Sequence, residues 1–147
     1  METIEINEEF SFAPEKVWAL LTDHAKYATY APLKESSLVK PGSTDRNGLG
    51  ATRKIMTDKI TFIEDITHFE PYNRFDYLIV ECSVPMKHYG GIIRFEKIDS
   101  GTKINWVSSY DLTGEVSPAI LRAIKSSSTK MFKEILAGVK RNLESNG

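Results

Sequence analysis

The strongest constraint on this fold is a single change of hydrophobic period near Gly114. Before that residue, apolar side chains mostly alternate with polar ones, which is typical of half-buried strands. After it, apolar residues recur at about 100° per residue, which predicts a long amphipathic helix. Because the two patterns occupy consecutive blocks of the chain, we expect an α+β fold in which one helix packs against a sheet.

The alternating block divides into seven strand candidates. Residues 3–12 form the first, and two short helical stretches follow at about 14–23 and 24–30, opened by Pro14 and stopped by Pro32. The other strand candidates span residues 34–40, 50–57, 59–69, 74–82, 87–98 and 102–113. Short loops between successive strands predict an antiparallel meander, because parallel strands need long crossover connections.

The helical block begins with Ser117 as the expected N-cap and Pro118 as the first helical residue. One broad apolar stripe runs along it, formed by Ile120, Leu121, Ile124, Met131, Phe132, Ile135, Val139 and Leu143. Such a stripe can cover the concave face of a curved sheet, and a straight helix cannot touch a curved sheet everywhere. We therefore expect a cavity between sheet and helix, within a single domain of residues 1–147.

Composition excludes several classes of protein. The 19 Lys and Arg against 20 Asp and Glu give a net charge of -1, so we expect no nucleic-acid partner. The single cysteine, Cys82, forms neither an internal disulfide nor a multi-cysteine zinc site. Neither a membrane-spanning apolar run nor a signal peptide is evident, so we expect a cytoplasmic protein without stable membrane insertion, either a monomer or a homodimer.

Three stretches carry a resemblance to a known family. They are residues 12–18, FAPEKVW, with LTD at 21–23; residues 48–53, GLGATR; and residues 69–77, FEPYNRFDY, with GTKINW at 101–106. In this order they resemble the birch-pollen-allergen-like superfamily, and within it the polyketide cyclase/dehydrase and lipid-transport branch related to START domains. The resemblance implies a helix-grip fold with a seven-stranded curved sheet and a ligand cavity. One departure is Tyr30, where many members carry a Trp near the cavity mouth.

Strand parity and the helical stripe together indicate which side chains face that cavity. On residues 102–113, Trp106 should point inward and Asn105 outward. Gly90 and Gly91 indicate a bulge or bend in the preceding strand, and Ser128 falls near the centre of the helical stripe. The candidate ligand-binding residues are Tyr77, Tyr89, Ile93, Phe95, Trp106, Ser108, Tyr110, Ile124, Ser128, Met131 and Ile135.

The remaining polar residues are harder to place. Between residues 50 and 69 both faces of the predicted strands are mixed, so the alternation pattern does not show which side chains face inward. Because Arg53 and Glu64 are charged, we expect them on the solvent face of the sheet, with a cavity position as the alternative. His24, His68 and His88 lack metal-motif spacing and are expected at the surface or half-buried, so we expect no metal and no other cofactor. No G-x-S-x-G motif is present, which excludes the corresponding serine hydrolase triad.

An aromatic cavity with a few hydroxyl groups favours the binding or transport of a small hydrophobic molecule, such as a lipid, polyketide or aromatic compound. A second hypothesis is a polyketide cyclase/dehydratase-like enzyme that acts in the same cavity, with unidentified catalytic residues. A third is a chaperone-activator-like interaction module that uses the convex sheet. The residues do not specify the ligand.

Overall fold

The computed structural model describes residues 1–146. Its elements are, in chain order, β1 (Glu2–Phe10), α1 (Pro14–Leu21), η1 (His24–Lys26), α2 (Tyr27–Tyr30), β2 (Glu35–Lys40), β3 (Thr52–Met56), β4 (Thr61–Glu70), β5 (Arg74–Cys82), β6 (Met86–Ile98), β7 (Gly101–Leu112) and α3 (Pro118–Asn146). The strands match the predicted ones in number and order, and their bounds differ by at most two residues.

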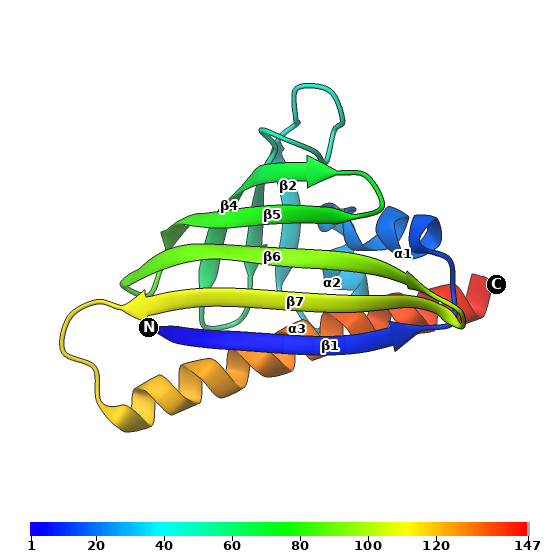
Figure 1. Ribbon diagram of the computed structural model, residues 1–147. Helices are drawn as coiled ribbons and strands as arrows, with labels where there is room; N and C mark the ends of the chain where they lie inside the picture. The colour runs from blue at the N-terminus through cyan, green and yellow to red at the C-terminus, as the bar shows by residue number, and fades with distance from the viewer. Residues whose placement is uncertain (147) are drawn as a thin grey trace.

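All of the strands belong to one antiparallel sheet, in the order β1-β7-β6-β5-β4-β3-β2. From β2 to β7, strands that are consecutive in the chain are neighbours in the sheet. In contrast, β1 pairs with β7, which places Ile6 opposite Trp106. Figure 1 shows the curved sheet and α3 running behind β1 and β7. The predicted helix-grip architecture is therefore confirmed, and the long helix closes the concave side.

The two halves of α3 are buried to different extents. The helix starts as predicted, because the Ser117 hydroxyl accepts a hydrogen bond from the backbone N–H of Ile120 at 3.2 Å. None of its residues from Pro118 to Met131 is buried, whereas most of the apolar residues from Phe132 to Leu143 are. The C-terminal half lies beside α1 and α2 (Figure 1) and anchors the helix, while the N-terminal half covers the far end of the sheet more loosely.

The end of the sheet beneath α1 is filled by aromatic side chains. Trp18 of α1 lies with its ring centroid 4.9 Å from that of Phe95, 5.1 Å from Phe69 and 5.7 Å from Phe75. We call these four residues the aromatic end. Ring pairs at these separations and tilts pack favourably, and Phe75 is completely buried.

Candidate functional site

At the other end, the sheet and α3 enclose a cavity of about 30 Å³, which we call the inner cavity. That volume admits a water molecule or another small polar group. Seven of the predicted ligand-binding residues line it: Tyr77, Trp106, Ser108, Tyr110, Ser128, Met131 and Ile135. Their arrangement confirms the predicted inward faces of β5 and β7 at these positions, and Trp106 is buried while Asn105 is only half-buried.

A buried ion pair forms one wall of the inner cavity. Arg53 of β3 and Glu64 of β4 lie directly opposite each other in the sheet, and they are 1% and 5% exposed. The Arg53 Nε–H donates to Glu64 Oε1 at 2.5 Å. Burial alone would lower the pKa of Arg53, but the charge and hydrogen bond of Glu64, together with Tyr27 and Tyr77, more than offset this and raise that pKa. The expected solvent-facing position of these two charges is therefore wrong.

The guanidinium of Arg53 lies between the aromatic rings of Tyr27 and Tyr77 and contacts the imidazole of His24. Its carbon lies 4.9 Å from the centroid of Tyr77 and 5.6 Å from that of Tyr27, and its Nη1 donates to Nδ1 of His24. Burial and the neighbouring guanidinium hold the pKa of His24 well below its usual range, so His24 is neutral. Because His24 is fully buried, the surface or half-buried position expected from the sequence is also wrong.

A bulge in β6 changes which side chains of that strand face inward. The β6–β7 register shifts between His88 and Gly90, and Gly90 has φ +126°, a conformation that favours glycine. The extra residue is Tyr89, which is 48% exposed and donates its hydroxyl proton to Asp111 at 2.6 Å. The predicted inward orientation of Tyr89 is therefore wrong, and His88 occupies the inward position instead, more buried than expected.

His88 bridges a gap between two strands. The β5–β6 pairing stops at Tyr77 and Gly91, and beyond that point the backbone N–H of Ile79 donates to His88 Nδ1 at 2.9 Å. Since Nδ1 accepts, the proton lies on Nε2, which donates to the Ser108 hydroxyl at 3.0 Å. Burial lowers the pKa of His88 to about 4. His88 is therefore neutral near pH 7 and has no free lone pair with which to deprotonate Ser108.

Gly91 makes room for the ring of Tyr77. A Cβ at position 91 would lie 2.1 Å from the Tyr77 Cζ atom, so only glycine lets that ring lie against β6, stacked on His88 at 5.6 Å. The Tyr77 hydroxyl accepts a hydrogen bond from Trp106 Nε1 at 2.9 Å. Burial raises the pKa of Tyr77, so this phenol stays protonated and retains a proton to donate.

Tyr110 lines the inner cavity and has a hydroxyl without a partner in the described part of the chain. Its side chain is 4% exposed, and its OH has no hydrogen-bond partner among the residues that the structure describes. Burial raises the pKa of Tyr110. Buried polar groups normally have hydrogen-bond partners, and an exception is explained by strain, by a functional role or by a bound water or ion.

A groove of about 380 Å³ lies outside the inner cavity, between α3, residues 31–33 and residues 57–60. Phe62, Ser128 and Met131 line both the groove and the inner cavity, and we call these three residues the barrier. Ile124, predicted to line the cavity, lines the groove instead. Tyr30, at the position of the family's frequent Trp, is buried and reaches the carbonyl of Leu20 at 3.3 Å rather than the groove.

The other two predicted cavity residues belong elsewhere. Ile93 is completely buried and Phe95 is part of the aromatic end, and neither lines the inner cavity or the groove. Their assignment to the cavity is wrong because inward parity on a strand does not distinguish a cavity from a filled core. In contrast, Arg53, Glu64 and His88 line the inner cavity although they were not among the predicted site residues.

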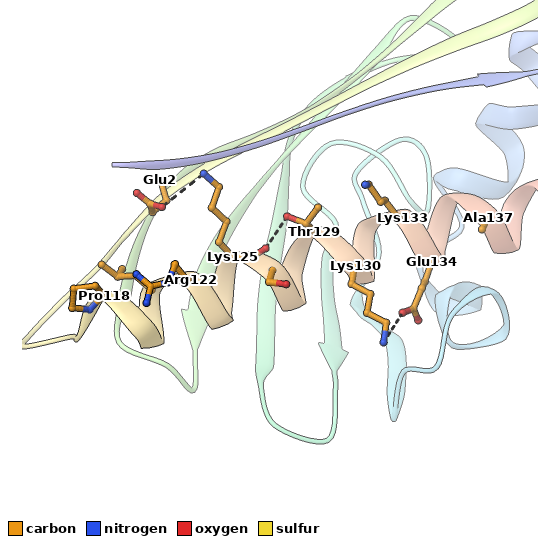
Figure 2. Close-up of a pocket in the computed structure, with 11 residues that line it drawn as sticks. Glu2, Pro118, Arg122, Lys125, Thr129, Lys130, Lys133, Glu134 and Ala137 are labelled. Carbon is orange, nitrogen blue, oxygen red and sulfur yellow. Dashed lines mark hydrogen bonds and ion pairs between the residues drawn. The ribbon is translucent and has the colours of Figure 1, made fainter.

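A wide hollow of about 960 Å³ lies on the outward face of α3 near Glu2. Figure 2 shows that two of its lysines are paired, Lys125 with Glu2 and Lys130 with Glu134, each at 3.8 Å. Surface pairs of this kind contribute little energy, and this open face has no buried polar group comparable to Tyr110. We therefore place the candidate site at the inner cavity and the groove.

Within residues 1–146 no group of three or more His, Cys, Asp or Glu side chains is arranged to hold a metal ion. In the same residues, no helix combines the length and the apolar character needed to cross a membrane.

Comparisons with solved structures agree with the fold. A protein from Thermus thermophilus superposes with a TM-score of 0.79 at 16% identity, covering 99% of each chain. A START superfamily protein from Mycobacterium smegmatis superposes with a TM-score of 0.73 at 11% identity, and the match covers 96% of this chain and 98% of the M. smegmatis chain. The protein Ara h 8.0201 gives 0.66 at 17% identity, covering 94% and 97%. Each likeness is below 25% identity and describes the fold alone.

Sequence comparison identifies the family. Comparison with curated proteins gives no significant match. The family described as polyketide cyclase / dehydrase and lipid transport matches residues 1–144, nearly the whole chain. This agrees with the resemblance carried by the motifs at residues 12–18, 48–53 and 69–77. The chain therefore belongs to the polyketide cyclase/dehydrase and lipid transport family.

Proposed function

We propose that this protein binds or carries a small hydrophobic molecule whose body lies in the groove and whose polar end reaches the inner cavity. The observation that carries the proposal is the barrier, because Phe62, Ser128 and Met131 alone line both spaces. The groove, at about 380 Å³, falls in the usual range for small-molecule sites, whereas the inner cavity suits one small polar group.

The barrier is built to open at low cost. Met131 is unbranched and adapts its shape readily, and Ser128 leaves a gap at the centre of the helical stripe. Both lie in the loosely packed half of α3, where no residue is buried. Regions with few buried apolar contacts open locally with a small free energy. Rotation of the Met131 and Phe62 side chains would join the groove to the inner cavity.

The hypothesis of a cyclase/dehydratase-like enzyme requires a group that transfers a proton. The lone pair of His88 Nδ1 is occupied by the Ile79 N–H, and burial raises the pKa of both Tyr77 and Tyr110. Glu64 is engaged by Arg53. These groups are suited to orient a ligand by donating hydrogen bonds and less suited to remove a proton from it. We therefore favour binding or transport over catalysis.

The hypothesis of an interaction module requires an apolar convex sheet. Tyr89 and Val80 are exposed on that side. However, the Lys87 Nζ atom lies 5.3 Å from the centroid of the Tyr89 ring, and the Tyr89 hydroxyl donates a hydrogen bond to Asp111. The groove beside α3 has stronger support as a binding surface, because it borders a cavity lined by Tyr110, whose buried hydroxyl has no partner within residues 1–146.

Tryptophan fluorescence tests the proposal. Trp106 lines the inner cavity and stacks on Phe132 with 4.2 Å between ring centroids, while Trp18 lies in the aromatic end. We expect a long-chain ketone or a flavonoid to change the fluorescence of Trp18→Phe, which retains Trp106. The same ligands should leave Trp106→Phe nearly silent. A response carried by Trp18 alone, or no binding from a panel of lipids, polyketide mimics and aromatics, would contradict the proposal.

A further inference from the structure

We infer that the inner cavity selects ligands with an uncharged hydrogen-bond acceptor, such as a ketone or ester carbonyl, and that the Tyr110 hydroxyl binds that acceptor. The inference rests on the proposed function and specifies the chemical class of its ligand. It also makes Tyr110 a specificity-determining residue. Three observations support it: the Tyr110 hydroxyl has no partner in residues 1–146, the charged residues that line the inner cavity are paired, and the hydrogen bonds of the cavity leave hydroxyl protons available.

The donor without a partner is the Tyr110 hydroxyl. This phenol is only 4% exposed, and no group in residues 1–146 accepts a hydrogen bond from it. Tyr110 lies opposite His88 in the β6–β7 ladder and next to Ser108 on the inward face of β7. A ligand acceptor placed in the inner cavity within reach of this hydroxyl would accept the hydrogen bond that no group in residues 1–146 accepts.

The charges around the site cancel. Arg53 and Glu64 are the two charged residues that line the inner cavity, and they pair with each other. The groove outside it has two acidic residues, Asp58 and Glu134, and two basic ones, Lys59 and Lys130. An anionic head group entering the cavity would lose its hydration without meeting an unpaired cation, which is costly. A neutral carbonyl has a much less favourable hydration free energy, so it loses far less on entering the cavity.

The hydrogen bonds of the cavity also point toward an acceptor. Ile79 N–H donates to His88, and His88 donates to Ser108, so the Ser108 hydroxyl retains its own proton. Tyr77 accepts from Trp106 Nε1 and likewise retains its proton. Each of these two hydroxyls thus accepts one hydrogen bond from the surrounding protein and keeps its own proton. Such a set complements a group that accepts hydrogen bonds.

Three ligands that share a naphthalene ring test this inference: 2-acetonaphthone, 2-naphthoate of similar shape, and unsubstituted naphthalene. Their affinities are measured by isothermal titration calorimetry at pH 7.5. We expect the wild-type protein to bind the ketone at least about 10-fold more tightly than the carboxylate, because the carboxylate enters unpaired. Tyr110→Phe should weaken ketone binding by about 3- to 10-fold, the usual effect of one neutral hydrogen bond. It should leave naphthalene binding unchanged.

Tyr89→Phe is the matched control, because it removes a phenol hydroxyl from the exposed face of β6. It should alter the affinity for none of the three ligands. Tyr110→Phe removes a hydroxyl that has no partner in the described part of the chain, so we expect the variant to fold with an unchanged or slightly higher melting temperature. That measurement makes a loss of ketone binding interpretable.

The outcomes distinguish the inference from the proposed function. Equal or tighter binding of 2-naphthoate would overturn the selection for uncharged acceptors. An equal loss of naphthalene and ketone binding in Tyr110→Phe, or no loss of either, would overturn the role of Tyr110. In both cases hydrophobic ligand binding itself would stand. Failure of all three ligands to bind would count against the proposed function as well.

Discussion

The two ends of the sheet use the same fold in opposite ways. At the aromatic end, Trp18 and three phenylalanines fill the space beneath α1, and Phe75 is completely buried. At the other end, which we call the polar end, the interior contains the Arg53–Glu64 pair, His88, Ser108 and Tyr110 around the inner cavity. One long helix covers both ends, but only its C-terminal half is buried.

This difference separates stability from binding. Aromatic side chains bury large apolar areas and dominate the energetics of a core, so the aromatic end together with the anchored half of α3 can hold the domain together. Buried polar groups add little net stability when paired and cost stability when unpaired. A ligand site at the polar end is therefore tolerable because the aromatic end does not depend on it.

The largest expected effect comes from Trp18→Ala at the aromatic end. Removing a buried indole that contacts Phe69, Phe75 and Phe95 should lower the free energy of unfolding by about 4 kcal/mol. Urea denaturation followed by circular dichroism measures this loss. Ligand affinity of the remaining folded protein should be unchanged, and a large change in affinity at modest loss of stability would show that the two ends are not separate.

The buried pair of the polar end should behave differently. Glu64→Leu leaves the Arg53 charge uncompensated and should cost about 3 kcal/mol, near the lower end for such pairs because the adjacent cavity admits water. The double variant Arg53→Met/Glu64→Leu removes both charges and should recover most of that loss, as measured by urea denaturation. If the double variant were less stable than Glu64→Leu, the pair would be a source of stability in its own right.

Acid should destabilise the protein through His88. Its pKa is about 4 in the folded state against an ordinary value near 6.5 in the unfolded chain. Between these values the unfolded chain binds more protons, so stability is complete above about pH 6.5 and falls as the pH drops toward 4. We expect His88 alone to account for a loss of about 2 kcal/mol between pH 7 and pH 4.5, with the free energy of unfolding measured by urea denaturation at each pH.

His88→Gln supplies the comparison for that pH dependence. Glutamine does not titrate, so the variant should lose less stability over the same pH interval, and the part that remains is attributable to His24, whose pKa is also lowered. A variant with the wild-type pH dependence would show that His88 is not the responsible group.

The smallest effect on stability is expected for Ser128→Leu in the barrier. Because Ser128 borders two open spaces, the larger side chain should change the free energy of unfolding by about 0.5 kcal/mol or less, whereas overpacking a filled core costs about 1–3 kcal/mol. Ligand binding should weaken, because leucine obstructs the passage. Ser126→Leu, on the exposed face of α3, is the matched control and should leave binding unchanged.

The sequence predicted the helix-grip architecture well because its signals are local and repeated. Alternation, turn residues and the Ser117–Pro118 helix start each identify an element within a few residues. The inward face of β7, with Trp106, Ser108 and Tyr110, followed from simple parity. These features depend on the regular geometry of strands and helices, so no knowledge of the tertiary contacts was required.

The polar end was harder to predict because it depends on interruptions and on pairs. Parity on β6 failed at the bulge, and the Gly90–Gly91 pair was the signal that should have moved Tyr89 outward and His88 inward. Arg53 and Glu64 are 11 residues apart in the chain, and either charge alone favours the solvent face. Only their cross-strand pairing makes burial tolerable, and that pairing required the β3–β4 register.

The most direct test of the account is nuclear magnetic resonance of the four methionine methyl groups, labelled with carbon-13, during titration with 2-acetonaphthone. Met131 belongs to the barrier and Met86 lines the inner cavity, whereas Met1 is exposed and Met56 lines neither space. We expect the Met131 signal to shift most, the Met86 signal to shift as well, and those of Met1 and Met56 to stay in place. Saturable binding that moves Met1 or Met56 while Met131 and Met86 remain unchanged would contradict a ligand site at the polar end.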